Sequence, residues 1–190
     1  TENSVFNGLI IDKTRMNRMM PACVKDGRIL VIDDALEPEQ VGDEALGTES
    51  GFARYLQLQN EFTGNIRKIV DLGVNAVFVY KSVSDMAEEM LTEAGVMVIR
   101  RVSASDIERI TKHTGAKMLK KTGLNKSACE LEDSVGRCEM IREDEKLDHI
   151  QITGGTGDSA VTILIGSSTR EMKEERKRIA EDASSAAQAV

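Results

Sequence analysis

Residues 72–119 read LGVNAVFVYKSVSDMAEEMLTEAGVMVIRRVSASDIERITKHTGAKML, and this stretch decides the fold class. It contains two short runs rich in β-branched residues, Asn75–Tyr80 and Gly95–Arg100, which are typical of strands. After each run comes a segment that starts at Ser, carries acidic residues and ends at Gly, namely Ser84–Gly95 and Ser103–Gly115. Those start and stop signals predict two helices. The order strand–helix–strand–helix–strand predicts parallel pairing.

Similar runs flank this stretch on both sides. They occupy Gly8–Asp12, Arg28–Asp33, Asp148–Thr153 and Ala160–Gly166. The residues from 120 to 153 predict a loop followed by antiparallel strands that a charged turn near Asp144 joins. We therefore expect an α/β fold with mixed and parallel sheet layers flanked by helices.

A long helix is predicted from Ser50 to Gly73. Its apolar residues recur at spacings close to 3.6, and they are Phe52, Tyr55, Leu56, Phe62, Ile66 and Val70. The preceding segment, Glu37–Ser50, is acidic and contains Pro and Gly, so we expect it to be flexible and the helix to stand away from the body. A last helix is predicted over Ser168–Val190, with a thin apolar stripe suited to resting on a neighbouring domain.

Bulk composition excludes several classes of protein. The net charge of -7 opposes nucleic-acid binding, and no apolar run approaches the roughly 20 residues that cross a membrane. Cys23, Cys129 and Cys138 form no C-x-x-C pair, which favours free thiols in a reducing cytoplasm. His113 and His149 have no second ligand at metal-binding spacing, so we expect no metal site.

Two glycine-rich segments leave a small-molecule site open. Gly154–Gly157 precedes a predicted strand, whereas a phosphate-binding loop should precede a helix; a hairpin or connecting loop is favoured there. Gly166–Thr169 does precede a helix but lacks the lysine of a P-loop. The alternative is thus an α/β enzyme or ligand-binding domain with phosphate at either segment. No catalytic residue can be assigned.

Methionines suggest a binding surface. The segment Arg15–Val24, RMNRMMPACV, contains Met16, Met19 and Met20. Methionine is flexible and polarizable, which suits a surface that accepts varied apolar partners. The opposing interpretation is that Met19 and Met20 fill a gap in the core. The same question arises on the second helix, for Met86, Met90 and Leu91.

The order of these segments is more specific than any one of them. The order begins with GLIIDK, a Met-rich loop ending in Pro21, GRILVIDDALE and the 72–119 stretch. It continues with LEDSVGRCEMI, AVTILIG and ERKRIAEDA. This ordered set resembles the apical domain of group II chaperonins, the archaeal thermosome and its eukaryotic cytosolic relatives. The resemblance implies an apical domain over residues 1–156, with a helical protrusion at about 36–65, and part of the intermediate domain over 157–190.

In that family the apical domain binds non-native polypeptide through a loop and a neighbouring helix, and the protrusion closes the folding chamber as a lid. Carried over, the loop matches Arg15–Pro21 and the helix matches Ser84–Ala94. The expected client-binding residues are Met16, Met19, Met20, Met86, Met90 and Leu91. On the protrusion, Leu46, Phe52 and Tyr55 are expected to be exposed near the tip, and Phe62, Ile66 and Val70 to pack inward.

The resemblance also implies partners and a cofactor for a longer subunit. The family's nucleotide motifs, including G-D-G-T-T, are absent from this sequence. The chain alone is therefore expected not to hydrolyse ATP and to need no cofactor, whereas the whole subunit would bind ATP and Mg. Expected partners are non-native polypeptides and other subunits of a cytoplasmic double ring. This sequence departs from the family's usual residues at Gly166, Ser167 and Lys177. These departures bear on the contacts between domains and on allosteric coupling.

Overall fold

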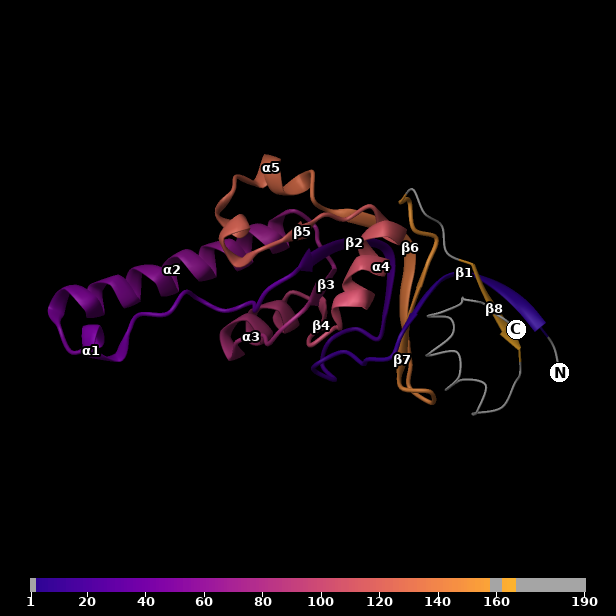
Figure 1. Cartoon of the computed structure of the whole chain (residues 1–190), viewed down its shortest axis with the longest axis horizontal. Coiled ribbons are helices and arrows are strands. Elements are labelled where there is room, and N and C mark those ends of the chain that lie inside the picture. Colours follow the sequence, from indigo (N-terminus) through magenta and orange to yellow (C-terminus); the bar gives the residue numbers. More distant parts are fainter. Residues whose placement is uncertain (1–2, 158–161, 167–190) are drawn as a thin grey trace.

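The structure, a computed structural model, describes residues 3–157 and 162–166, and its centre is one sheet of eight strands (Figure 1). The strands of the described part are β1 (Asn3–Ile11), β2 (Cys23–Ile32), β3 (Ala76–Val79), β4 (Met97–Ile99), β5 (Met118–Leu119), β6 (Gly136–Asp144), β7 (His149–Thr153) and β8 (Thr162–Gly166). Their order is β4-β3-β2-β6-β7-β1-β8, and β5 pairs with β2. The predicted helix over Ser168–Val190, and with it most of the predicted intermediate-domain segment, lies outside the described residues.

The sheet is mixed, as the sequence predicted. β2, β3 and β4 are parallel, with Ile29 opposite Ala76 and Ala76 opposite Met97. β5 also runs parallel to β2. The pairs β2–β6, β6–β7, β7–β1 and β1–β8 are antiparallel. The α/β fold class and the six strand positions predicted from the sequence are confirmed.

Both faces of the parallel strands are covered. Leu30 and Val77 point to a core under α2 and α3, whereas the adjacent Ile29 and Phe78 point to a second core under α4. Because successive strand residues point to opposite faces, a strand buried on both sides must be apolar throughout. That is why these strands read as continuous β-branched runs.

The described part contains the three predicted helices and three shorter ones. They are α1 (Asp43–Leu46), α2 (Glu49–Asp71), α3 (Asp85–Glu93), α4 (Ala104–Thr114), the 3-10 helix η1 (Lys121–Asn125) and α5 (Ala128–Glu132). The Ser84 and Ser103 side chains accept hydrogen bonds from backbone amides in the first turns of α3 and α4. Gly115 ends α4 with φ of 81°, a conformation that a residue without Cβ adopts freely. The sequence did not predict α1, η1, α5 or β5, because elements of two to five residues carry no measurable periodicity.

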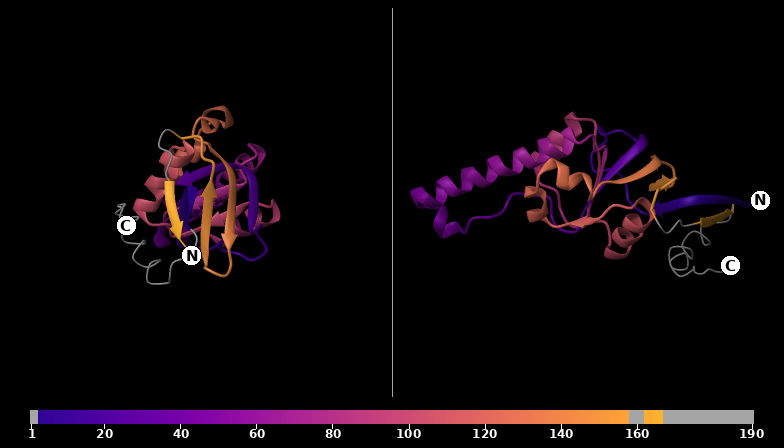
Figure 2. Two further views of the ribbon diagram at one scale, coloured as in Figure 1. Left: turned by 90° about the vertical axis from the view of Figure 1, so that its right-hand side faces the viewer. Right: turned by 90° about the horizontal axis from the view of Figure 1, so that it is seen from above.

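α2 extends beyond the sheet (Figures 1 and 2). Its C-terminal half packs against the core through Phe62 and Ile66, and Val70 is partly buried there, as expected. The N-terminal half, with α1 beside it, projects away from the sheet at the end opposite β8 (Figure 1). The predicted separation from the body is thus present for the N-terminal half of this helix and wrong for its C-terminal half. Residues 42–57, which include α1 and the N-terminal part of α2, lie within the stretch of about 36–65 predicted as a protrusion, and from here on we call residues 42–57 the protrusion.

Within the described residues, none of the helices combines the length and the apolar character that crossing a membrane requires.

Candidate functional site

The Met-rich loop, residues 12–22, connects β1 to β2 and presents one large apolar side chain to solvent. Met19 is 80% exposed, Met16 is half-buried, and Met20 is only 2% exposed. The Met19 amide donates to the Asn17 side-chain oxygen at 2.8 Å, which fixes a tight turn immediately before the exposed methionine. Asn17 in turn donates to Glu88 of α3 at 3.0 Å, so this turn is attached to the neighbouring helix.

The expectation that Met20 is available on the surface is wrong. Its sulfur accepts a 3.4 Å hydrogen bond from the Val98 amide, and the side chain belongs to the core under α2 and α3. The Met16 amide donates to the Val98 carbonyl at 2.9 Å, so the loop runs along the exposed edge of β4. The core-filling interpretation therefore holds for Met20 and fails for Met19.

On α3, only part of the expected surface is accessible. Leu91 is fully buried together with Ala87, one turn earlier, so the assignment of Leu91 to a contact surface is also wrong. Met86 and Met90 are half-buried and rest against the same core. Helical spacing puts them on one flank of α3 and Glu88, which binds the loop, on the other. The exposed face of α3 thus separates the two methionine groups.

The protrusion carries a cluster of exposed apolar side chains. Phe52 is 52% exposed and stacks on Tyr55 with ring centroids 6.0 Å apart and planes inclined by 21°. Leu46 of α1 is exposed too, as expected for the tip. Leu56 is also exposed, although it was predicted only as part of the apolar stripe. We call Leu46, Phe52, Tyr55 and Leu56 the tip patch.

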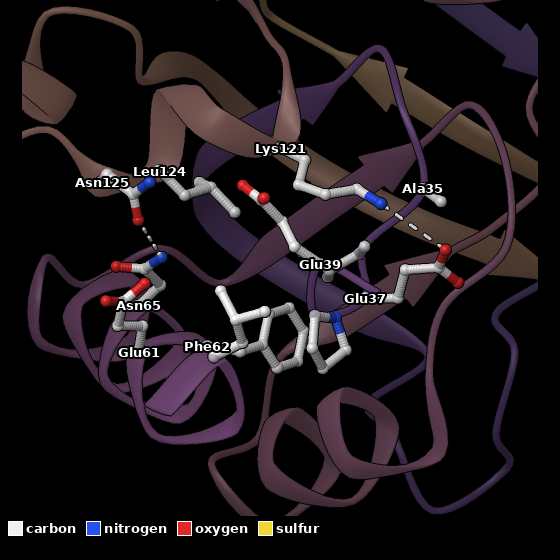
Figure 3. A pocket seen from close by; sticks show the side chains of 12 residues that line it. Ala35, Glu37, Glu39, Glu61, Phe62, Asn65, Lys121, Leu124 and Asn125 are labelled. Carbon is white, nitrogen blue, oxygen red and sulfur yellow. Dashed lines mark hydrogen bonds and ion pairs between the residues drawn. The ribbon is translucent and has the colours of Figure 1, made fainter. Parts of the chain in front are cut away.

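A shallow cleft lies where α2 meets the body (Figure 3). Its walls come from the segment after β2, from α2 and from η1. Lys121 bridges to Glu37 at 3.5 Å, and Asn65 donates to Asn125 at 2.9 Å across the cleft. These contacts join the segment after β2 and the C-terminal half of α2 to η1. The sequence did not single out this cleft, because its walls come from three separate segments.

The glycine segment Gly154–Gly157 does not form a phosphate-binding loop. The Gly155 amide donates to the His113 ring at 3.1 Å, and the Gly157 amide donates to the His113 carbonyl at 2.9 Å. Amides engaged at the C-terminal end of α4 cannot hold an anion, and that end of a helix repels negative charge. The second segment, Gly166–Thr169, extends outside the described residues.

The titratable groups of the described part form no metal-binding cluster. No group of three His, Cys, Asp or Glu residues there could hold a metal ion. Burial raises the pKa of the Cys138 thiol to about 12, so it stays protonated and unreactive at neutral pH. Burial also lowers the pKa of His113, which favours the neutral ring that accepts from Gly155.

Comparison with known sequences gives one consistent family. Residues 1–190 match the TCP-1/cpn60 chaperonin family. The thermosome subunit beta of Archaeoglobus fulgidus is 33% identical over 190 residues, a match that covers 96% of this chain and 34% of that protein. The thermosome subunit of a Desulfurococcus species is 31% identical over 188 residues, with the same coverage. The chain thus spans about a third of the length of these relatives.

Comparison with solved structures points to the same family. A group III chaperonin in the open state superposes with a TM-score of 0.83 and 36% identity, and the match covers 96% of this chain and 37% of that one. An open-state monomer of a group II chaperonin from Methanococcoides burtonii superposes with a TM-score of 0.63 and 26% identity, over 90% of this chain and 37% of that one.

Proposed function

Because the chain belongs to the TCP-1/cpn60 chaperonin family, we propose that it is the polypeptide-handling part of a chaperonin subunit and assists protein folding. In this proposal residues 1–156 are the apical domain and residues 157–190 begin the intermediate domain. The whole subunit assembles into a double ring in the cytoplasm and binds ATP and Mg through segments outside this chain. The chain itself binds non-native polypeptide and is not a catalyst.

The tip patch is the observation that carries this proposal. Seven large apolar side chains are exposed among those that the structure describes, and four of them are Leu46, Phe52, Tyr55 and Leu56. Grouped apolar exposure on a soluble protein usually marks an interaction site. These side chains stand on an element that projects from the body, where they can reach a client or the protrusion of a neighbouring subunit. Both roles fit a lid that closes a folding chamber.

Met19 supplies a second contact, closer to the sheet. An exposed methionine adapts to differently shaped apolar side chains, because its unbranched chain has many rotamers and its sulfur is polarizable. Met16 remains in the proposal as a half-buried neighbour of Met19 in the loop, and Met86 and Met90 remain as a separate half-buried contact on the other flank of α3. Each contact is weak, and repetition around a ring would strengthen the total binding.

Suppression of client aggregation tests the proposal. The 190-residue chain should delay aggregation of a reduced, unfolded lactalbumin. The triple variant Phe52→Ser, Tyr55→Ser, Leu56→Ser should lose most of this effect, and Met19→Ser should lose part of it. Met118→Ser is the matched control, because Met118 is an exposed methionine on β5 outside both surfaces.

Equal protection by the wild-type chain and the triple variant would remove the tip patch from the proposal. If the Met118 control failed as badly as Met19→Ser, general surface apolarity rather than a defined site would explain the binding.

A further inference from the structure

Glu143, near the end of β6, contacts both ends of the Met-rich loop. Its carboxylate accepts a hydrogen bond from the Arg15 amide at 3.0 Å, and its own amide donates to the Ala22 carbonyl at 2.8 Å. β2 and β6 pair up to Cys23 opposite Arg142, so Glu143 is the next residue along and faces the loop. One residue of the sheet therefore closes a loop of eight residues, from 15 to 22.

A buried ion pair reinforces this closure. The Arg15 guanidinium lies 2.9 Å from the second carboxylate oxygen of Glu143, and both side chains are only 8% exposed. A further contact of Arg15 with Glu145, at 3.3 Å, involves a solvent-exposed carboxylate and contributes little. Removing Glu143 leaves the buried guanidinium with only the exposed Glu145 carboxylate, and removing Arg15 leaves the buried Glu143 carboxylate without its cation, so the loss of either partner disfavours the observed loop conformation.

The pair is not optimised for stability alone. The Nε atom of Arg15 is buried and has no hydrogen-bond partner within the described residues. An unsatisfied buried donor costs free energy, and a well-packed apolar pair can replace a buried ion pair without loss. A buried arginine at this place therefore calls for a reason other than the stability of the fold.

The opposite side of the loop is anchored as well, through Met16 and Met20 on Val98 of β4. Between these anchors, only the Arg18 and Met19 side chains are exposed. A loop ordered before binding loses less conformational entropy when a partner arrives, so its affinity is higher. The anchors thus hold Met19 in solvent and prevent it from folding back against the body.

We propose that Glu143 is a positioning residue for client binding: its carboxylate orders the Met-rich loop through Arg15 without touching the client. This inference rests on the proposed function, since it assumes that Met19 contacts non-native polypeptide. It assigns a role to a side chain of β6 that lies more than 100 positions from the loop in the sequence.

The test uses Glu143→Gln in the 190-residue chain, because glutamine keeps the size of the side chain and removes its charge. The matched control is Glu132→Gln, which removes a carboxylate held by Arg28 at 2.7 Å and Arg137 at 3.2 Å, away from the loop. The double variant Arg15→Gln, Glu143→Gln leaves no buried unpaired charge and serves if the single variant does not fold.

Two measurements separate a positioning role from a general structural one. Amide hydrogen exchange at residues 15–22 should become about tenfold faster relative to α4 in Glu143→Gln. The dissociation constant for reduced, alkylated lactalbumin, measured where all variants are folded, should rise about three- to tenfold. The Glu132 control should change neither quantity at the loop.

Unchanged client affinity in Glu143→Gln, with or without a loss of stability, would overturn the inference. So would unchanged exchange in the loop. If the wild-type chain did not bind the client at all, the proposed function would fail, and the exchange rates alone would still decide whether Glu143 holds the loop.

Discussion

Adjacent methionines of the Met-rich loop have opposite environments. Met19 is 80% exposed and Met20 is 2% exposed, although they share residue type and local sequence. The difference arises because Val98 of β4, far along the chain, donates to the Met20 sulfur and leaves Met19 on the outer side of the turn. Burial at this point is decided by a neighbour that is distant in sequence.

This difference predicts unequal effects of truncation. Met20→Ala should lower the free energy of unfolding by about 2–5 kcal/mol, since it removes buried volume from the core. Met19→Ala should change it by about 0.5 kcal/mol or less, as for most exposed positions. Urea denaturation of both variants measures the difference. Similar losses in the two would contradict the burial described for Met20.

The burial of His113 predicts that the folded chain loses stability in acid. Burial lowers its pKa below the ordinary 6.5, so the unfolded chain binds a proton at a pH where the folded chain does not. Its contribution is therefore fully present above pH 6.5 and declines as the pH falls from there toward the lowered value. Thermal unfolding midpoints between pH 7.5 and 5 measure this effect. His113→Gln should show a smaller decline than the wild type; an identical decline would assign the acid sensitivity to carboxylates instead.

At the scale of the element, α2 is one helix with two environments. Its C-terminal half buries Phe62, Ile66 and Ile69 against the sheet, whereas Phe52 and Tyr55 meet solvent. The apolar periodicity runs through both halves without a break, which is why the sequence could not locate the point where burial ends. Only the position of the sheet decides that the stripe is core at one end and surface at the other.

Gly51 and Gly64 give a matched pair of tests on this helix. A Cβ at Gly51 would collide with the Ala45 carbonyl of α1, whereas the same atom at Gly64 would meet open space. Gly51→Ala should detach α1 from α2. Hydrogen exchange of the α1 amides should then be faster than in the wild type. Gly64→Ala should stabilise the chain by about 0.5–1 kcal/mol, since alanine is the better helix former. Exchange of the α1 amides at the wild-type rate in Gly51→Ala would contradict this packing.

At the scale of the whole molecule, the protrusion and the β1–β8 edge lie at opposite ends (Figures 1 and 2). The two apolar cores lie between them, on the two faces of the parallel strands. The exposed apolar side chains of the tip patch are therefore outside the part that determines stability. This arrangement separates the binding surface from the folding core.

That separation predicts a tolerated deletion. Glu39 and Glu61 line the same cleft, so a short Gly-Ser linker in place of residues 42–56 can rejoin the chain near it (Figure 3). The shortened chain should fold with a change of about 1 kcal/mol or less in the free energy of unfolding, because nothing buried in the sheet is lost. The shortened chain should also lose the ability to protect unfolded lactalbumin from aggregation. A large fall in the urea midpoint would show that the protrusion belongs to the core.

Much of the fold was predictable because its signals are local. The 72–119 stretch defines two strands and two helices through side-chain periodicity, Ser84 and Ser103 at helix starts, and Gly115 at a helix end. The chaperonin family was likewise predictable from the order of these segments, and the family match confirms it. The predicted client-binding set was only partly accessible, since Met20 and Leu91 are buried.

By itself the sequence determined the positions of six strands and of the three longer helices, that the fold is α/β, and to which family the chain belongs. Steric preference, capping and apolar period act within a few residues, so they can be read in order along the chain. The tertiary structure alone decided that Met19 is outside and Met20 inside, that the apolar stripe of α2 ends in solvent, and that Glu143 closes the Met-rich loop. Burial and ion pairing depend on which distant segments meet, and that is settled only when the sheet has formed.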